Sequence, residues 1–347
     1  MTSPTTARPS ELWFTRCPVP TATGIAADRG WLAGEFADDG IAVRSLQDVP
    51  RDLAADHHYT HAHPALFREG GNVPALWARA QGEPTRLIGL TWIEERQSVL
   101  VRANSGITGP ADLRGARLAV PVHGIAIDFW RAMALHGFAG ALSAAGLGLG
   151  DAHLVEVPGS AHGQWEAELA ALARGDVDAV YVKGALAVEA AARSGAVVSV
   201  DLDAQPDRRA RVNNGTPRPI TVHQRLLDEH PDVVDRFLAV LLATADWARG
   251  NGDDVARILG AETGAGDAAV AQAYRGVGHT SLGVDLSDER LELLEIQERF
   301  LHSQGFLRQR VDVRAWADPE PLRRARALVA RPAREVRRGD ARVVPGE

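Results

Sequence analysis

The alternation of short apolar segments with amphipathic helical segments predicts an α/β fold whose sheets are rich in parallel strands. Two further observations refine this prediction. The chain has 347 residues, more than one compact domain usually needs, so we expect two lobes. Hydrophobic residues make up 45% of the chain, which is enough to bury a large core. Helical patterns dominate the last third, after the strands.

Apolar runs bounded by turn residues predict the strands. They occupy residues 11–15, 41–47, 85–92, 98–104 and 196–202, with further strands at the ends of the segments 112–121 and 163–182. Helical periodicity predicts the remaining elements. It occurs in residues 23–40, 73–80, 127–137, 163–174, 223–250, 288–307 and 323–336.

This order of elements predicts a discontinuous first lobe. The C-terminal helices must return to cover the first strands, so residues 10–104 and 216–335 are expected to form lobe 1. Residues 105–215 are expected to form lobe 2, and residues 336–347 a C-terminal tail.

Composition excludes several classes of function. The formal charge of −7 and a pI near 6.0 argue against a nucleic-acid partner, which requires a basic surface. A single cysteine excludes an internal disulfide framework and a thiolate zinc cluster. No apolar run approaches the roughly 20 residues of a membrane helix, and the N-terminus lacks a signal-peptide pattern. A cytoplasmic protein is therefore expected, with a monomer favoured.

The single cysteine, Cys17, lies in the sequence "RCPVPTA". Free cysteines are usually buried and inert, so a packed thiol is one interpretation. Pro18 favours an extended backbone at Cys17, which places it at a strand end. Strand ends line the ligand crevices of open α/β sheets, so Cys17 is also a candidate reactive residue.

A histidine cluster and an arginine–glycine turn follow in residues 56–80. His57, His58, His61 and His63 suggest a metal site, but Pro64 breaks the helical spacing and the carboxylate ligands are few, so no metal is predicted. In "REGGN", Arg68 precedes Gly70 and Gly71, and Asn72 is a candidate N-cap of the next helix. Backbone N–H groups at such a turn, together with an arginine, make an anion site, although a plain helix start is the simpler interpretation.

Taken together, three segments resemble the aromatic sulfinate desulfinases. They are "RCPVPTA", the stretch "HYTHAHPALFREGGNVPAL" from residue 58, and "ITGPADLRGARLAV". The last segment is common to the wider superfamily and indicates only the fold. The resemblance implies a two-lobed fold of the type II periplasmic-binding-protein class, with a cleft between the lobes. It also implies cleavage of an aryl sulfinate C–S bond with release of sulfite, without a metal or an organic cofactor.

The resemblance also implies roles for particular residues. Cys17 matches the family's reactive cysteine and His58 its active-site histidine. Arg68 and the N–H of Gly71 match the groups that hold the sulfinate oxygens. Trp130, on the helical segment "IDFWRAMALHG", matches a pocket tryptophan, although a core aromatic is the simpler interpretation. Whether Cys17 acts as an acid or as a nucleophile stays open.

The sequence also departs from the family pattern. Glu69 stands where the family has an aromatic residue, and His61 and His63 replace residues of a loop over the substrate. The segment between Leu154 and Asp176 is shorter than in the family. Two other functions therefore stay open: a solute-binding protein that delivers a sulfonate-like anion to a transporter, and an enzyme of the same fold with another small substrate. The lack of an export signal favours an enzyme.

Overall fold

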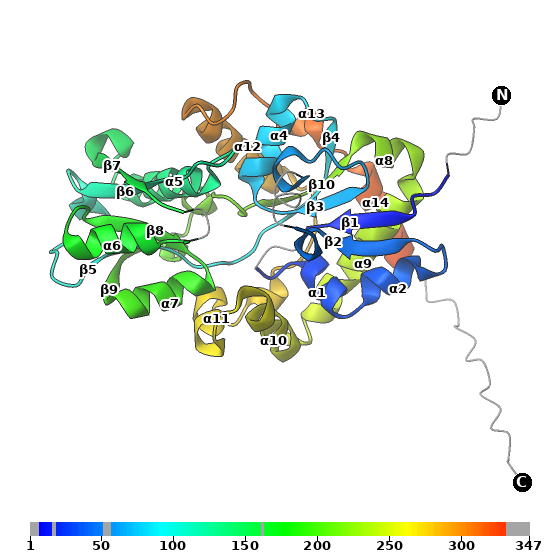
Figure 1. The fold of residues 1–347 in the computed structure, drawn as a ribbon, viewed down its shortest axis with the longest axis horizontal. Coiled ribbons are helices and arrows are strands. Elements are labelled where there is room, and N and C mark those ends of the chain that lie inside the picture. Colours follow the sequence, from blue (N-terminus) through cyan, green and yellow to red (C-terminus); the bar gives the residue numbers. More distant parts are fainter. Residues whose placement is uncertain (1–6, 16–18, 51–56, 161–162, 331–347) are drawn as a thin grey trace, which may run out of the picture.

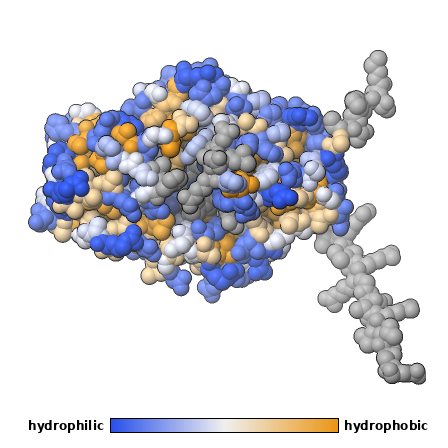
Figure 2. Space-filling model, in the orientation of Figure 1, coloured by the Kyte–Doolittle hydropathy of each residue, from blue (hydrophilic) through white to orange (hydrophobic). Residues whose placement is uncertain are grey.

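The computed structural model describes residues 7–15, 19–50, 57–160 and 163–330. Two five-stranded sheets, each covered by helices, lie side by side along the long axis of the molecule (Figure 1). We call the layers around them the first lobe and the second lobe. Hydrophilic residues cover much of the face shown in Figure 2, and smaller hydrophobic areas lie between them.

The sheet of the first lobe has the strand order β2-β1-β3-β10-β4. Strand β1 is parallel to β2 and β3, whereas β10 is antiparallel to β3 and β4. The strands are β1 (Glu11–Phe14), β2 (Ala42–Ser45), β3 (Leu66–Glu69), β4 (Thr85–Thr91) and β10 (Arg218–His223). The ends of β3 and β4 and the start of β10 therefore meet at one edge of this sheet.

The sheet of the second lobe has the order β7-β6-β8-β5-β9, and β5 is antiparallel to both of its neighbours. Its strands are β5 (Gln97–Arg102), β6 (Arg117–Val122), β7 (His153–Pro158), β8 (Ala179–Lys183) and β9 (Ala196–Asp201). Strand β5 lies in the range expected for lobe 1, so the strand order moves that boundary from residue 104 to residues 92–96. The other expected limits stay predictions, and the tail 336–347 lies outside the described residues.

Helices cover both sheets (Figure 1). Helices α1 (Ala22–Asp28), α2 (Trp31–Ala37), α4 (Asn72–Gln81), α8 (Gln224–Glu229), α9 (Pro231–Ala248) and α14 (Glu320–Val329) accompany the first sheet, and α5 (Phe129–Ser143), α6 (Glu166–Arg174) and α7 (Ala185–Ser194) accompany the second. The remaining helices are α10 (Gly252–Thr263), α11 (Asp267–Tyr274), α12 (Asp288–Ser303) and α13 (Val313–Trp316). Helix α11 packs on α7 and so joins the C-terminal half to the second lobe.

Two strand-to-strand segments connect the lobes. The chain leaves β4 and enters β5 through residues 92–96, and it returns from β9 to β10 through residues 202–217. The fold is α/β, as the sequence predicts, but the sheets are mixed rather than rich in parallel strands. Among the described strands, each sheet has two parallel and two antiparallel pairings. None of the described helices combines the length and the apolar character that crossing a membrane would take.

The expected single helix over residues 23–40 is in fact two helices. Gly30 adopts a left-handed backbone conformation with φ of 71°, which ends α1 and begins α2. Glycine reaches this conformation without a steric cost, so it interrupts a pattern that otherwise reads as continuous.

Candidate functional site

Arg68 lies on β3, at the edge where β3, β4 and β10 meet, and its side chain is fully buried. Its Nε donates to the His58 carbonyl oxygen at 3.0 Å, and its Nη1 donates to the Gly71 carbonyl oxygen at 3.0 Å. Its Nη2 lies 3.4 Å from His58 Nε2. These contacts fix the plane of the guanidinium and bring together three of the residues singled out in the sequence.

The imidazole of His58 is neutral at ordinary pH. Burial lowers its pKa well below the usual 6.5, and the nearby Arg68 guanidinium lowers it further. A guanidinium can only donate, so His58 Nε2 is the accepting nitrogen and Nδ1 carries the proton. This neutral imidazole therefore acts as a hydrogen-bond acceptor that orients Arg68, and the lowered pKa makes it resist protonation.

The two glycines of the turn have no room for a side chain. A Cβ on Gly70 would lie 2.9 Å from Arg68 Nη1, and one on Gly71 would lie 2.1 Å from Asn214 Oδ1. The Asn214 carboxamide therefore packs directly against the turn. Its Oδ1 also accepts from the Val73 N–H at 3.1 Å, which caps the first turn of α4.

The predicted capping role of Asn72 is wrong. Helix α4 begins at Asn72 itself, after Gly71 as the N-cap residue. The buried Asn72 side chain donates instead to the carbonyl oxygens of Asn213 and Pro217, at 2.7 and 2.9 Å. The helix start is thus tied to the segment that returns from the second lobe.

Glu69 ends β3 as a buried carboxyl group. It accepts from the Thr23 N–H and hydroxyl at 3.2 and 2.5 Å, and the Thr91 hydroxyl lies 3.3 Å away. Burial raises its pKa, and its threonine partners oppose that rise. Its carbonyl oxygen accepts from the Thr15 hydroxyl at 3.0 Å, so the end of β1 lies against the end of β3.

The other histidines of the cluster have separate partners. His61 is buried, with Nε2 lying 3.4 Å from the Leu66 carbonyl oxygen and Nδ1 lying 3.2 Å from the Thr221 hydroxyl. The rings of His57 and His63 pack edge to face at 5.3 Å. Within the described ranges, no group of three or more His, Cys, Asp and Glu side chains is arranged to hold a metal ion.

Cys17 and Trp130 are not brought to this turn by any described contact. Cys17 lies outside the described residues. Trp130, near the start of α5, packs against Phe129 and Trp165 of the second lobe, with ring centroids 5.3 and 5.5 Å apart. Phe129 in turn approaches Tyr59, next to His58, at 6.4 Å. The predicted roles of Cys17 and Trp130 stay predictions.

Sequence reasoning missed a second set of polar residues beside this turn. Lys183, at the end of β8, pairs with Glu95 at 3.1 Å and donates to the Asn214 carbonyl oxygen at 2.6 Å. Arg218 begins β10 and is also buried. Lys183 is the sole lysine of the chain, beside 37 arginines, and this exception was the signal that could have drawn attention to the position.

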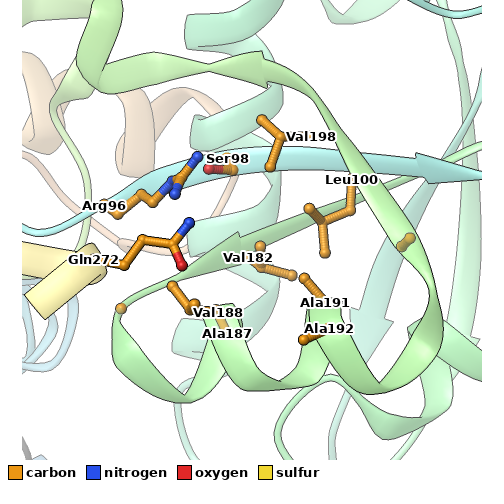
Figure 3. A pocket seen from close by; sticks show the side chains of 12 residues that line it. Arg96, Ser98, Leu100, Val182, Ala187, Val188, Ala191, Ala192, Val198 and Gln272 are labelled. Carbon is orange, nitrogen blue, oxygen red and sulfur yellow. The ribbon is translucent and has the colours of Figure 1, made fainter. Parts of the chain in front are cut away.

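A separate pocket of about 230 Å³ lies between the second sheet and α7 (Figure 3). Its lining is mostly aliphatic, with Arg96, Ser98 and Gln272 as its polar side chains. None of the turn residues described above lines it, and its composition does not indicate a reaction.

The two sheets, their antiparallel strands β5 and β10 and the double connection define a fold of the type II periplasmic-binding-protein class. The model of the family described as "NMT1/THI5 like" matches residues 20–254. The 2'-hydroxybiphenyl-2-sulfinate desulfinases of Rhodococcus erythropolis and Rhodococcus qingshengii are each 31% identical to this chain, over 90% of it and 92% of the relative. The chain therefore belongs to the NMT1/THI5-like family and to the family of the 2'-hydroxybiphenyl-2-sulfinate desulfinases.

Solved structures agree with this assignment. A cysteine-to-serine mutant of DszB in complex with biphenyl-2-sulfinic acid has a TM-score of 0.73 and 28% identity, covering 92% of this chain and 99% of the other. The periplasmic aliphatic sulphonate binding protein SsuA from Escherichia coli has a TM-score of 0.69 and 17% identity, covering 90% and 93%. At that identity, the likeness to SsuA shows the fold alone.

Proposed function

We propose that this protein is an enzyme that cleaves the C–S bond of an aromatic sulfinate and releases sulfite. The observation that carries the proposal is the buried Arg68, which His58 and Gly71 orient at the sheet edge, in a chain 31% identical to desulfinases over 90% of its length. A fixed guanidinium beside a glycine turn suits a small oxyanion group.

The reaction adds water across the C–S bond. An aryl sulfinate and one water molecule give the arene, with hydrogen in place of sulfur, and hydrogen sulfite. The bond breaks by one of two routes. In the first, an acid protonates the ring carbon that carries sulfur, and sulfur dioxide departs and adds water to give hydrogen sulfite. In the second, a nucleophile attacks sulfur while the departing ring carbon takes a proton, and water later releases the sulfur from the nucleophile as hydrogen sulfite. Both routes need fixed donors on the sulfinate oxygens, because negative charge must be held there while the bond breaks.

Each candidate residue has a role in this proposal. Arg68 and the Gly71 N–H hold the sulfinate oxygens, and Cys17 is the acid or the nucleophile. His58, neutral and in contact with Arg68, orients the arginine. Thr15, two residues before Cys17 in the sequence, bonds to Glu69, the neighbour of Arg68, which supports an assignment of Cys17 to the same site. A cytoplasmic location also belongs to the proposal.

A solute-binding protein for a sulfonate-like anion is the second candidate. It is favoured by the shared fold of SsuA and by the anion turn, which needs no catalytic residue. The two functions predict different outcomes for the same ligands.

The test is to incubate the purified protein with a panel of aryl sulfinates and to measure sulfite with time. Calorimetry with the corresponding sulfonates runs in parallel. Catalytic sulfite release, with many turnovers per protein, supports the enzyme. Tight binding of sulfonates without sulfite release from any sulfinate would instead support the binding protein.

A further inference from the structure

Arg218 lies beside the anion turn but on a different strand. It is the first residue of β10, and the carbonyl oxygen of the following Pro219 accepts from the Gly70 N–H at 3.3 Å. Consecutive residues of the returning segment link the two places: Asn214 packs on Gly71, and Gly215 packs on Arg218. The Arg218 side chain therefore belongs to the same edge of the first sheet as the turn.

The charge of Arg218 is unusual because it is buried and unpaired. Arg218 is only 4% exposed, and its Nε has no hydrogen-bonding partner among the described residues. Across the part of the chain that the structure describes, no ion pair or hydrogen bond joins its guanidinium to another residue. Buried arginines are normally paired, because an unpaired charge away from water costs several kcal/mol.

The guanidinium is directed toward the second lobe. A Cβ on Gly215 would lie 2.7 Å from Arg218 Nη2 and 3.3 Å from Lys183 Nζ, so the two cations from different lobes approach the same point. Glu95 neutralises the charge of Lys183, with which it forms an ion pair at 3.1 Å. No carboxylate among the described residues forms an ion pair with Arg218; the buried Glu69 carboxyl, at the end of the neighbouring strand, feels its charge, because Arg218 lowers the pKa of Glu69.

A second buried polar atom without a described partner interacts electrostatically with Arg218 and Glu95. The Tyr274 hydroxyl, at the end of α11, is buried and makes no hydrogen bond within the described part of the chain. Burial raises the pKa of Tyr274 well above its usual value, Glu95 raises it further, and Arg218 opposes the rise. A neutral hydroxyl donor and an unpaired guanidinium suit an acceptor group that carries negative charge.

We infer that Arg218 binds a carboxylate on the substrate, so that the substrate is an aromatic sulfinate with a second, anionic group on its ring. This inference rests on the proposed function for the identity of the first group. The Arg68 turn takes the sulfinate, and Arg218 takes the carboxylate. The fixed fork of an arginine matches a carboxylate in two parallel hydrogen bonds.

The experiment compares benzenesulfinate with its 2-, 3- and 4-carboxy derivatives. Sulfite release gives kcat/KM for each, and calorimetry with benzenesulfonate and the three sulfobenzoates gives Kd without turnover. In the natural protein, we expect at least one carboxylated isomer to be preferred on the order of tenfold in both measurements. Arg218→Met should abolish that preference, and Arg218→Lys should keep part of it.

Arg96→Met is the matched control. Arg96 lies on the connection between β4 and β5, and its guanidinium pairs with Asp201 at 3.8 Å. Its loss removes one positive charge from the same region, and the preference for the carboxylated isomer should survive. Arg218→Met should also have an equal or higher Tm than the natural protein, because it removes an unpaired buried charge.

The outcomes separate this inference from the proposed function. Sulfite release from benzenesulfinate without a preference for any carboxylated isomer would overturn the inference and leave the function standing. A preference that Arg218→Met retains would also overturn it. Tighter sulfobenzoate binding that depends on Arg218, without sulfite release from any substrate, would support the carboxylate site and contradict the enzyme.

Discussion

The contact between Asn214 and Gly71 determines the shape of the anion-binding turn at the level of single residues. Asn214 Oδ1 occupies the space that any side chain at position 71 would need, and it also caps α4. The glycine is therefore required for close packing, in addition to its proposed role as a backbone donor to the sulfinate.

Gly71→Ala should displace the Asn214 side chain and weaken both the turn and the cap. We expect a loss of about 1–3 kcal/mol in the free energy of unfolding, and weaker binding of sulfonates by calorimetry. Gly34→Ala on α2 is the control, because a Cβ there meets no atom within 4 Å. It should stabilise the helix by about 0.5–1 kcal/mol. Equal stability of the two variants would show that Asn214 moves aside freely.

His61 should make stability depend on pH. Burial, with a contribution from Arg68, lowers its pKa from 6.5 to about 3. Between these values the unfolded chain binds a proton that the folded protein excludes, so this contribution to stability is complete above pH 6.5 and falls as the pH falls. His61→Asn, which tolerates the φ of 56° at this position, should flatten the slope by about 1.4 kcal/mol per pH unit.

Urea unfolding at pH 7, 6 and 5 measures that slope. His153→Asn, at an exposed position on β7, is the control and should keep the slope of the natural protein. An unchanged slope in His61→Asn would mean that His61 takes up a proton in the folded state as readily as in the unfolded state.

Single residues were predictable where they form a compact motif. Arg68 and Gly71 are close in the sequence, so a local pattern was enough to group them, whereas His58 was added by the resemblance; the structure brings all three into contact. Asn214 and Lys183 come from distant segments, and the fold alone brings them beside the turn.

At the level of elements, the start of α4 connects the glycine turn to the returning segment 213–217 through hydrogen bonds. Asn72 donates to two carbonyl oxygens of that segment, and Asn213 in turn donates to the Met133 carbonyl oxygen at 3.1 Å and to the Tyr181 hydroxyl at 3.0 Å. The segment is therefore anchored to elements of both lobes.

Asn72→Ala should remove the hydrogen bonds between the start of α4 and the returning segment. The Pro217 carbonyl oxygen would lose its donor, whereas the Asn213 carbonyl oxygen would keep the Thr216 N–H at 2.9 Å. We expect a loss of about 1–3 kcal/mol in the free energy of unfolding. Gln81→Ala, at the other end of α4, is the control and should change stability by less than about 0.5 kcal/mol. Denaturant unfolding of both variants measures the difference. Equal losses of stability would contradict a stabilising role of the Asn72 hydrogen bonds.

The strands that the sequence did not reveal include the two that carry the site. Strands β4 and β6 are nearly continuous apolar runs, and both were predicted. Strand β3 contains Arg68 and Glu69, and β10 begins with Arg218 and Pro219, so their charged and proline residues hide the strand pattern. The charged residues that interrupt the apolar strand pattern are the same residues that supply the polar groups at this end of the sheet.

At the level of the whole molecule, the two-lobed architecture was predictable because the alternation of elements extends over both lobes. The boundary between the lobes was less predictable, since β5 and β10 each follow a connection that crosses from the other lobe. A local sequence pattern does not show which lobe the next strand joins. The same architecture serves binding proteins and desulfinases, so the fold alone does not decide the function.

The most direct test of the proposed function is sulfite release by the natural protein and by Cys17→Ser from one aryl sulfinate. Serine preserves the size of the side chain, but its proton is far less acidic than that of a thiol with a pKa of about 8.5. We predict that the natural protein releases sulfite, that Cys17→Ser loses at least about 100-fold in kcat, and that both bind the corresponding sulfonate equally by calorimetry. Equal sulfite release by the two proteins would contradict a catalytic cysteine, and no release by either would contradict the desulfinase.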